Sequence, residues 1–240
     1  MKEFHYDLHI HSCLSPCGDD EMTPATIAGM AALGGLDLVA LTDHNTCANC
    51  GAFLAACDAY GIVGLPGMEL TSAEDVHLLC LFAELCDAER FSAEVSTRRV
   101  RIPNRPDIFG RQLIVNEEDE ILGEEPDLLI NATLLSLSEA SSLCRACGGV
   151  PIPAHADKTA NGVVAMLGAV PADCGFRTAE YARADAPDAP GAEGFLRISS
   201  SDAHFVEDIR DTERASSLML AGETPQEIRR SLLRRLEEGK

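Results

Sequence analysis

The stretch FHYDLHIH, residues 4–11, decides the fold class of this chain. It is a short apolar run of the kind that forms a buried strand. His9 and His11 lie two residues apart, so in a strand both side chains point to the same side of the sheet. Two imidazoles at this spacing can bind one metal ion together.

Strand and helix patterns alternate outward from this stretch through the first 85 residues. Thr23 and Pro24 fit the N-cap and first position of a helix, which ends at Gly34 and Gly35. LDLVALT, a helix near 52–60, GIVGLPGMEL and VHLLCLF follow in order. This alternation predicts an α/β fold of βα units around a parallel sheet.

The second half is less regular. Charged residues, Pro and Gly interrupt the pattern over 98–126, and a region rich in Ala, Asp and Pro covers 182–194, so both are expected to be excursions from the framework. The remaining expected elements are a helix from about Leu135, the strands GVPIPAH, FLRISSSDAH and SSLMLA, and a helix opened by Thr224 and Pro225. With 240 residues and a hydrophobic fraction of 46%, we expect one domain over 1–240.

The net charge of −20 indicates a surface that repels a phosphate backbone, so no stable nucleic-acid binding is expected. Divalent ions would reverse the local field where a phosphorylated substrate docks. No apolar segment has the length of a membrane span or the context of a leader peptide, which predicts a cytoplasmic protein without a membrane partner. Its ten cysteines are then expected to be reduced thiols.

Six of the seven histidines lie in, or at the ends of, predicted strands. They are His9, His11, His44, His77, His155 and His204, and Glu69 and Asp202 are interleaved with them. Because the carboxyl ends of parallel strands meet on one face, most of these side chains should converge there; His77, at a strand start, requires an antiparallel turn or a loop. A single histidine in a strand is more often structural, but this set is typical of zinc, manganese or iron ligands.

These motifs together resemble the PHP family, named for polymerase and histidinol phosphatase domains. The resemblance is carried, in the family's order, by DLHIHS (7–12), LTDHN (41–45), PGME (66–69), VH (76–77), PAH (153–155) and SDAH (201–204). It implies a distorted (β/α)7 barrel with two or three divalent metal ions at its C-terminal mouth. Hydrolysis of phosphoesters is the activity that the resemblance implies.

The resemblance also implies nine metal ligands, with Glu69 as a bridge. They are His9, His11, Asp19, His44, Glu69, His77, His155, Asp202 and His204. Asp19 is inferred by counting back from the helix start at Thr23, with Asp20 as the alternative. A solvated loop cap is the other interpretation of this acidic pair.

The implied mechanism is attack on phosphorus by a hydroxide that bridges two ions, while a third neutralises the phosphoryl oxygens and the leaving group. Asp202 or His204 is the candidate for the leaving-group proton, in competition with metal binding. Asp43, which we count with them among the catalytic residues, and Asp7 are expected to orient imidazoles.

Candidate cations for substrate binding are Arg101, Arg105, Arg111 and Lys158. Planar guanidinium groups suit phosphate, although ordinary surface charge is the alternative for each of them.

Cysteines suggest a separate site. Cys13 and Cys17 follow the first strand, and Cys47 and Cys50 follow the second, so four thiolates could hold a structural zinc or form a redox pair. Small buried thiols are the alternative interpretation.

We therefore expect a metal-dependent phosphoesterase that acts on a small phosphorylated metabolite or nucleotide. A 3′-5′ exonuclease of the same family and a catalytically degenerate, regulatory metal-binding module are the alternatives. The negative charge argues against the nuclease, and the full ligand set argues against the degenerate module.

Overall fold

The computed structural model describes residues 1–183 and 185–239, and its centre is a six-stranded sheet. The strand order is β10-β1-β2-β3-β4-β7, formed by β1 (Lys2–Ile10), β2 (Leu38–Leu41), β3 (Val63–Thr71), β4 (His77–Leu81), β7 (Val150–Pro153) and β10 (Ser216–Leu220). β1, β2 and β3 are parallel, as predicted. β4 is antiparallel to β3 and β7, and β10 is antiparallel to β1, which corrects the expectation of an all-parallel sheet. The segment between β3 and β4 is too short for a crossover helix, so the chain has to reverse direction there.

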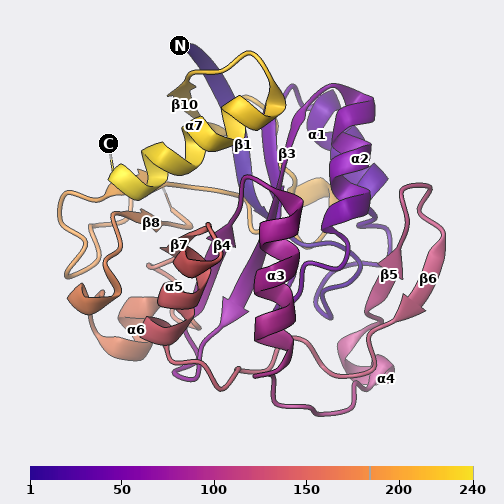
Figure 1. Ribbon diagram of the computed structural model, residues 1–240, viewed down its shortest axis with the longest axis horizontal. Coiled ribbons are helices and arrows are strands. Elements are labelled where there is room, and N and C mark those ends of the chain that lie inside the picture. The colour runs from indigo at the N-terminus through magenta and orange to yellow at the C-terminus, as the bar shows by residue number, and fades with distance from the viewer. Residues whose placement is uncertain (184, 240) are drawn as a thin grey trace.

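Two further strands continue the curvature of the sheet. β8 (Thr178–Glu180) and β9 (Leu196–Ile198) pair in parallel. The Ala156 N–H donates to the Glu180 carbonyl beyond the end of β7, and Ile10 at the end of β1 forms a parallel bridge with Ala203. The strands therefore curl into a distorted α/β barrel (Figure 1), which confirms the predicted fold class.

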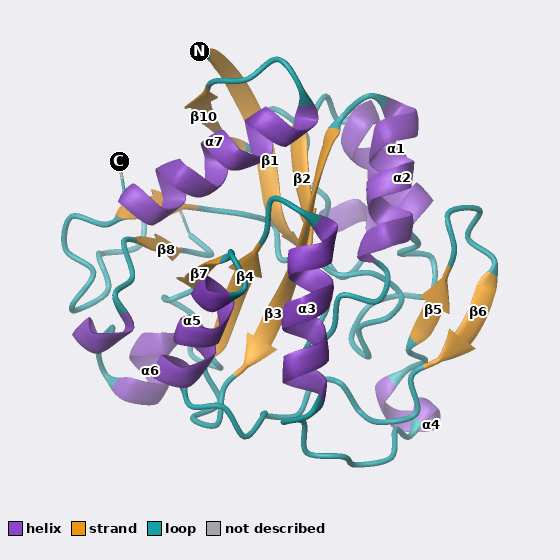
Figure 2. Cartoon of the chain, viewed as in Figure 1, coloured by secondary structure: helices purple, strands orange, loops and turns teal. Residues whose placement is uncertain are grey.

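Helices surround the strands (Figure 2). They are α1 (Pro24–Leu33), α2 (Cys50–Tyr60), α3 (Leu85–Ser96), α5 (Leu137–Ala146), α6 (Val163–Leu167) and α7 (Pro225–Glu238). α1 begins as predicted, with the Thr23 hydroxyl accepting from the Thr26 N–H. α7 begins with a capping box formed by Thr224 and Glu227.

Alternate residues of the strands enter two separate apolar clusters. The α7 cluster contains Phe4, Tyr6, Leu8, Leu38, Ala40, Val63, Leu65, Leu79, Leu81, Val150, Ile152, Leu232 and Leu236. The outer-helix cluster contains Ile10, Val39, Leu41, Met68, Leu70, Leu78 and Cys80 from the strands, and Ile27, Phe53, Phe91 and Leu137 from the helices. Because neighbouring residues of a strand face opposite sides, these memberships show which way each strand presents its side chains.

The two expected excursions differ in structure. Residues 98–126 contain the short helix α4 (Pro106–Phe109) and a hairpin of β5 (Leu113–Val115) and β6 (Ile121–Glu124). The described residues of 182–194 contain no helix or strand. Short 3-10 turns lie at Ala172–Cys174 and Val206–Asp208. None of the helices in the described part of the chain combines the length and apolar character that crossing a membrane requires.

Candidate metal centre

The register of β1 turns His9, and His11 just beyond the strand, inward. Tyr6 and Leu8 face the α7 cluster, whereas Ile10 faces the outer helices, and the pairing of β1 with β2 shifts register between Asp7 and Ile10. Such an irregularity re-aims side chains. His9 and His11 therefore both project to the interior, where both are fully buried.

The other strands bring their ligand candidates to the same place. Glu69 and His77 have the same parity as the strand residues of the α7 cluster, so both face inward. His77 does so from an antiparallel strand, the requirement stated above. His155 and Asp202 follow strand ends with positive φ angles of 28° and 55°. This left-handed backbone is uncommon for residues other than glycine, and such geometry concentrates at functional sites.

Glu69 lies at the centre of the candidate metal ligands. Its Oε1 lies 2.8 Å from His77 Nδ1, 3.0 Å from His155 Nε2 and 3.3 Å from His9 Nε2. Its Oε2 lies 3.3 Å from His11 Nε2 and 3.2 Å from His44 Nδ1. One carboxylate therefore contacts five imidazoles, an arrangement that suits a ligand shared between ions.

Buried carboxylates make this interior attractive to cations. Burial would lower the pKa of His9, but the charges of Asp202, Glu180 and Glu69 outweigh it and raise that pKa well above its usual value. Burial would raise the pKa of Asp202, yet the neighbouring His9 and His11 hold it far below its ordinary range. Burial and His11 lower the pKa of His204 to about 4, so its ring is neutral at neutral pH.

The residues present fit divalent metal ions. Three groups of ligand atoms each lie within 4.8 Å of one another: His9, His11, Glu69 and Asp202; His44, Glu69 and His77; and His11, His44 and His204. His44 Nδ1 and His155 Nδ1 are buried and have no hydrogen-bond partner. Buried polar atoms normally have partners, and imidazole nitrogens beside carboxylate oxygens are the donor set of transition metals.

Two carboxylates outside the ligand set support the histidines. Glu180 Oε2 accepts from His9 Nδ1 at 2.9 Å and from the His155 N–H at 3.0 Å. Asp43 Oδ1 accepts from the Ser15 hydroxyl, which lies 2.9 Å from His11 Nδ1. Asp43 therefore supports His11 through Ser15.

Glu180 is not marked by the sequence, because a glutamate in the short stretch TAE belongs to no motif and no periodic pattern. Asp7, expected to orient an imidazole, instead accepts from the Ser201 N–H at 2.9 Å and so anchors the segment that leads to Asp202.

Comparison with known proteins identifies the family of this chain. The sequence profile of the PHP domain matches residues 7–142. The chain belongs to the PHP family. Among curated proteins, no match to the sequence is found.

Solved structures share the fold. Endonuclease Q from Pyrococcus furiosus is 18% identical, with a TM-score of 0.66, over 98% of this chain and 56% of its own. An endonuclease Q bound to a 27-mer duplex with an abasic lesion is 21% identical, with a TM-score of 0.68, over 95% and 56% of the two chains. A protein from Bifidobacterium adolescentis, named as a candidate metal-dependent phosphoesterase, is 21% identical, with a TM-score of 0.52, over 83% and 87%. The chain thus spans little more than half the length of the endonuclease Q chains.

Of the nine ligands implied by the PHP resemblance, the structure gathers eight and places Asp19 apart from them. The Asp19 carboxylate accepts a hydrogen bond from the Glu21 N–H at 2.8 Å, as expected for a residue that caps a loop. Asp20, the alternative, is exposed and lies 3.9 Å from Arg111. Neither belongs to a group of candidate ligands among the described residues.

Of the four cations expected to bind substrate, one lies at the metal cavity and three do not. Lys158 lines the metal cavity of the PHP domain and contacts Asp202. The three arginines instead form ion pairs: Arg101 with Asp127, Arg105 with Asp107, and Arg111 with Glu124. None of these arginines lines the metal cavity.

The four cysteines of the two loops have different surroundings. Cys47 and Cys50 both donate to the Gly67 carbonyl, at 3.2 and 3.5 Å, whereas Cys13 donates to the Leu113 carbonyl. Cys17 alone of the four lines the metal cavity. These contacts favour small buried thiols for the first three.

Proposed function

We propose that this PHP protein hydrolyses a phosphoester of a small metabolite or nucleotide, using two or three divalent ions of zinc, manganese or iron. The single observation that carries the proposal is Glu69, which lies between histidines from several strands and can join the ligand groups into one centre. The gathering of eight of the nine PHP-type ligands favours an enzyme over a degenerate regulatory module.

Ions held there would generate a nucleophile from water at neutral pH and neutralise phosphoryl oxygens. The side chains define the ligand roles. His204 Nδ1 donates a hydrogen bond to the Asp202 backbone carbonyl at 2.8 Å. The lone pair of Nε2 in the neutral ring is therefore free to bind a metal ion. Because Asp202 is ionised and His204 is neutral, both suit ligation better than delivery of a proton to the leaving group.

Lys158 is suited to bind the phosphoryl group. Among the residues that line the metal cavity it is the only lysine or arginine. Burial would lower its pKa, but the Asp202 carboxylate raises it, so the ammonium stays charged. A positive charge at this edge would attract and orient a phosphate despite the negative charge of the whole chain.

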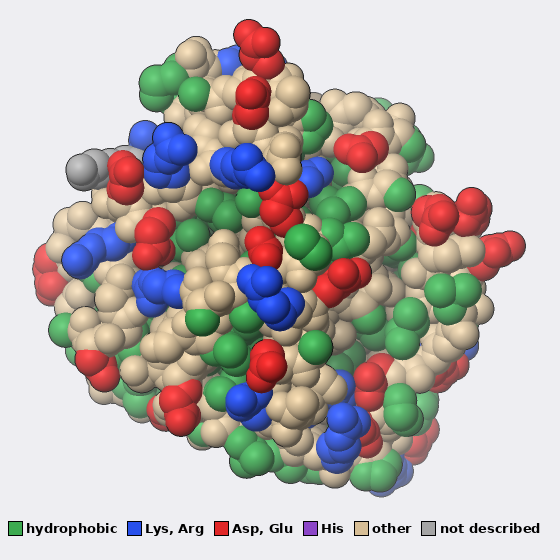
Figure 3. All heavy atoms as spheres, viewed as in Figure 1, with side chains coloured by type: hydrophobic (Ala, Val, Ile, Leu, Met, Phe, Trp, Pro, Cys, Tyr) green, Lys and Arg blue, Asp and Glu red, His purple; other side chains and the backbone are tan. Residues whose placement is uncertain are grey.

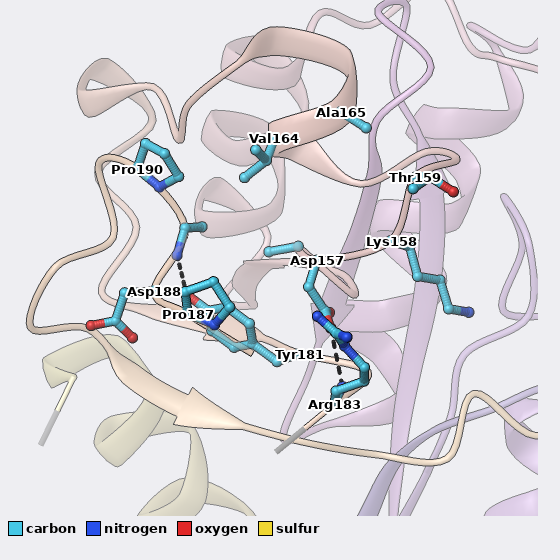
Figure 4. Close-up of a pocket in the computed structure, with 12 residues that line it drawn as sticks. Asp157, Lys158, Thr159, Val164, Ala165, Tyr181, Arg183, Pro187, Asp188 and Pro190 are labelled. Carbon is cyan, nitrogen blue, oxygen red and sulfur yellow. Dashed lines mark hydrogen bonds and ion pairs between the residues drawn. The ribbon is translucent and has the colours of Figure 1, made fainter. Parts of the chain in front are cut away.

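A second cavity could hold the organic part of the substrate. It has a volume of about 320 Å³, and Lys158 lines it as well as the metal cavity. Figure 4 shows Val164 and Tyr181 on opposite sides of it and Lys158 at one edge. Mostly apolar walls with a few polar groups are typical of small-molecule sites.

Phosphate release from a panel of substrates tests the function. The panel comprises sugar phosphates, histidinol phosphate, nucleotides and 3′,5′-bisphosphates, assayed with measured metal content. His9→Ala should abolish turnover and lower metal content together, because His9 belongs to a ligand group. His5→Ala is the matched control, since His5 lies on the same strand but contacts Asp37 outside the site. Bound metal without turnover of any phosphoester would overturn the phosphatase and favour the regulatory module.

Nucleic acid as the substrate is the second candidate, because an endonuclease Q of similar fold was solved with a DNA duplex. The net charge of −20 argues against it. In the described part of the face shown in Figure 3, acidic and basic side chains are interspersed and form no continuous basic track. Cleavage of oligonucleotides in preference to the small phosphoesters would reverse this choice.

A further inference from the structure

The chain returns from the excursion over 98–126 to the metal centre at Ile130. This residue is half-buried and lines the metal cavity, which has a volume of about 220 Å³. Among the described residues that line this cavity, it is the only large aliphatic side chain, and the others are polar, charged or small. A partly exposed isoleucine is common on any surface, so its meaning depends on how firmly the protein holds it there.

One buried amide fixes the backbone on both sides of Ile130. Asn45 Nδ2 donates to the Leu129 carbonyl at 2.6 Å and to the Asn131 carbonyl at 2.9 Å. Asn45 Oδ1 accepts from the Thr71 N–H at 3.0 Å. The amide therefore joins the segment around Ile130 to the end of β3.

The backbone of Asn45 is held beside the metal ligands. Its N–H donates to the Glu69 carbonyl at 3.0 Å, and its φ angle is 52°. Asparagine adopts this left-handed region more readily than most residues, because its short amide can form local hydrogen bonds. The buried side chain needs two N–H donors and one oxygen acceptor for its contacts, which a carboxamide has and a carboxylate lacks.

A second buried amide holds the same segment from the side of the excursion. Gln112 Oε1 accepts from the Leu129 N–H at 2.8 Å, and Gln112 Nε2 donates to the Asp127 carbonyl at 3.0 Å. The Thr133 N–H donates to a carbonyl of β3 at 2.9 Å. Backbone groups at every second residue from 127 to 133 are therefore fixed. Ile130 is thus presented to the cavity by a rigid support, not by a loose loop.

We propose that Ile130 determines substrate specificity at the metal centre. It packs against the alcohol part of the phosphoester and selects alcohols with an apolar surface beside the ester oxygen over polyols. Contact with an apolar group removes apolar surface from water, whereas the hydroxyls of a polyol would lose water without gaining a partner from this side chain. Asn45 acts through Ile130 as a positioning residue. The inference rests on the proposed function, because it requires a phosphoryl group at the metals.

Binding of two phosphonates tests the proposal without turnover. Phenylphosphonate and methylphosphonate share a head group and differ in the organic group, and both are titrated calorimetrically into the zinc-loaded protein. The wild type should bind phenylphosphonate more tightly. Ile130→Ala should weaken binding of phenylphosphonate about tenfold and leave that of methylphosphonate unchanged. Ile102→Ala is the matched control, because Ile102 is an exposed isoleucine of the excursion that does not line the cavity.

A double-mutant cycle tests the role of Asn45. Asn45→Asp keeps the shape and the acceptor but lacks the two N–H donors, so it should weaken phenylphosphonate selectively, as Ile130→Ala does. Combined with Ile130→Ala it should cause no further loss of selectivity, because both changes remove the same contact. An amide with a merely structural role would affect both ligands alike. Asn45→Ala replaces Asn45→Asp in the cycle if the latter does not fold, and metal content is measured for every variant.

The outcomes separate the inference from the proposed function. Unchanged affinity for phenylphosphonate in Ile130→Ala, or equal losses for both phosphonates, would overturn the role of Ile130. A further loss of selectivity in the double variant would overturn the role of Asn45. If neither phosphonate binds to the metal-loaded wild type, the phosphoryl site of the proposed function is refuted, and the specificity falls with it.

Discussion

Glu180 offers a quantitative test of how the protein supports its metal centre. One oxygen, Oε2, accepts from both His9 Nδ1 and the His155 N–H, while Oε1 has no hydrogen-bond partner. In Glu180→Gln the amide oxygen can take the place of Oε2, and the amide nitrogen that of Oε1. This substitution removes the charge and preserves both hydrogen bonds. Glu180→Ala removes the acceptor as well.

The expected magnitudes follow from these contacts. Loss of an outer partner of a histidine ligand typically weakens metal binding about 10- to 100-fold, and we expect Glu180→Gln near the lower limit and Glu180→Ala near the upper. That range corresponds to about 1.4 to 2.8 kcal/mol. Glu180→Ala also leaves two buried donors unsatisfied at about 1–3 kcal/mol each, so its free energy of unfolding should fall by about 2–6 kcal/mol.

Competition with a chromogenic chelator would measure metal affinity, and urea unfolding of the metal-free protein would measure stability. Glu89→Gln, an exposed change on α3, is the control for loss of one negative charge. Unchanged metal affinity in both Glu180 variants would refute the assigned role. Equal losses of affinity in the two variants would show that the charge alone, and not the hydrogen bonds, supports the site.

Two further substitutions test the surroundings of the centre. Asp43→Asn keeps the shape of the acceptor that Ser12 and Ser15 contact but removes its charge, so metal affinity should fall about tenfold, as measured by the same competition. Unchanged affinity would exclude action through Ser15 on His11. Ala165→Phe should fill part of the second cavity and raise KM for a nucleotide while leaving hydrolysis of a small phosphate ester unchanged, as initial rates would show. Equal KM values for both substrates in variant and wild type would place the organic group elsewhere.

Local sequence patterns predict the first three strands and the starts of two helices. The apolar runs of β1, β2 and β3 and the caps at Thr23 and Thr224 depend on neighbouring residues, and these elements form where the sequence predicts them. The alternation of strands and helices predicts a parallel sheet, whereas β4 is antiparallel to β3. The position of His77 at the start of a strand was the one sign of this reversal. The orientation of β4 follows from the short connection after β3, which no hydrophobic pattern encodes.

The candidate site was predictable only where a motif marks it. Glu180 approaches His9 from a position 171 residues away in sequence, and its three-residue strand is too short to show periodicity. Asp19 matched a motif by count, but the backbone of its loop directs Cys17 to the cavity instead. Only their charge marks the three arginines in the sequence, and the acidic residues that pair with them cannot be predicted without the fold.

The long interval between the first and last candidate ligands affects how the protein is made. β1 carries His9 and leads directly to His11, yet it pairs with β10, and Ile10 bridges to Ala203 beside Asp202 and His204. A nascent chain therefore exposes His9 and His11 long before their partners leave the ribosome. Such non-local pairing folds slowly, and early metal capture could only yield incomplete sites. We expect correct loading to follow synthesis of the final strand, so metal supplied after folding should populate the centre more uniformly than metal supplied during translation.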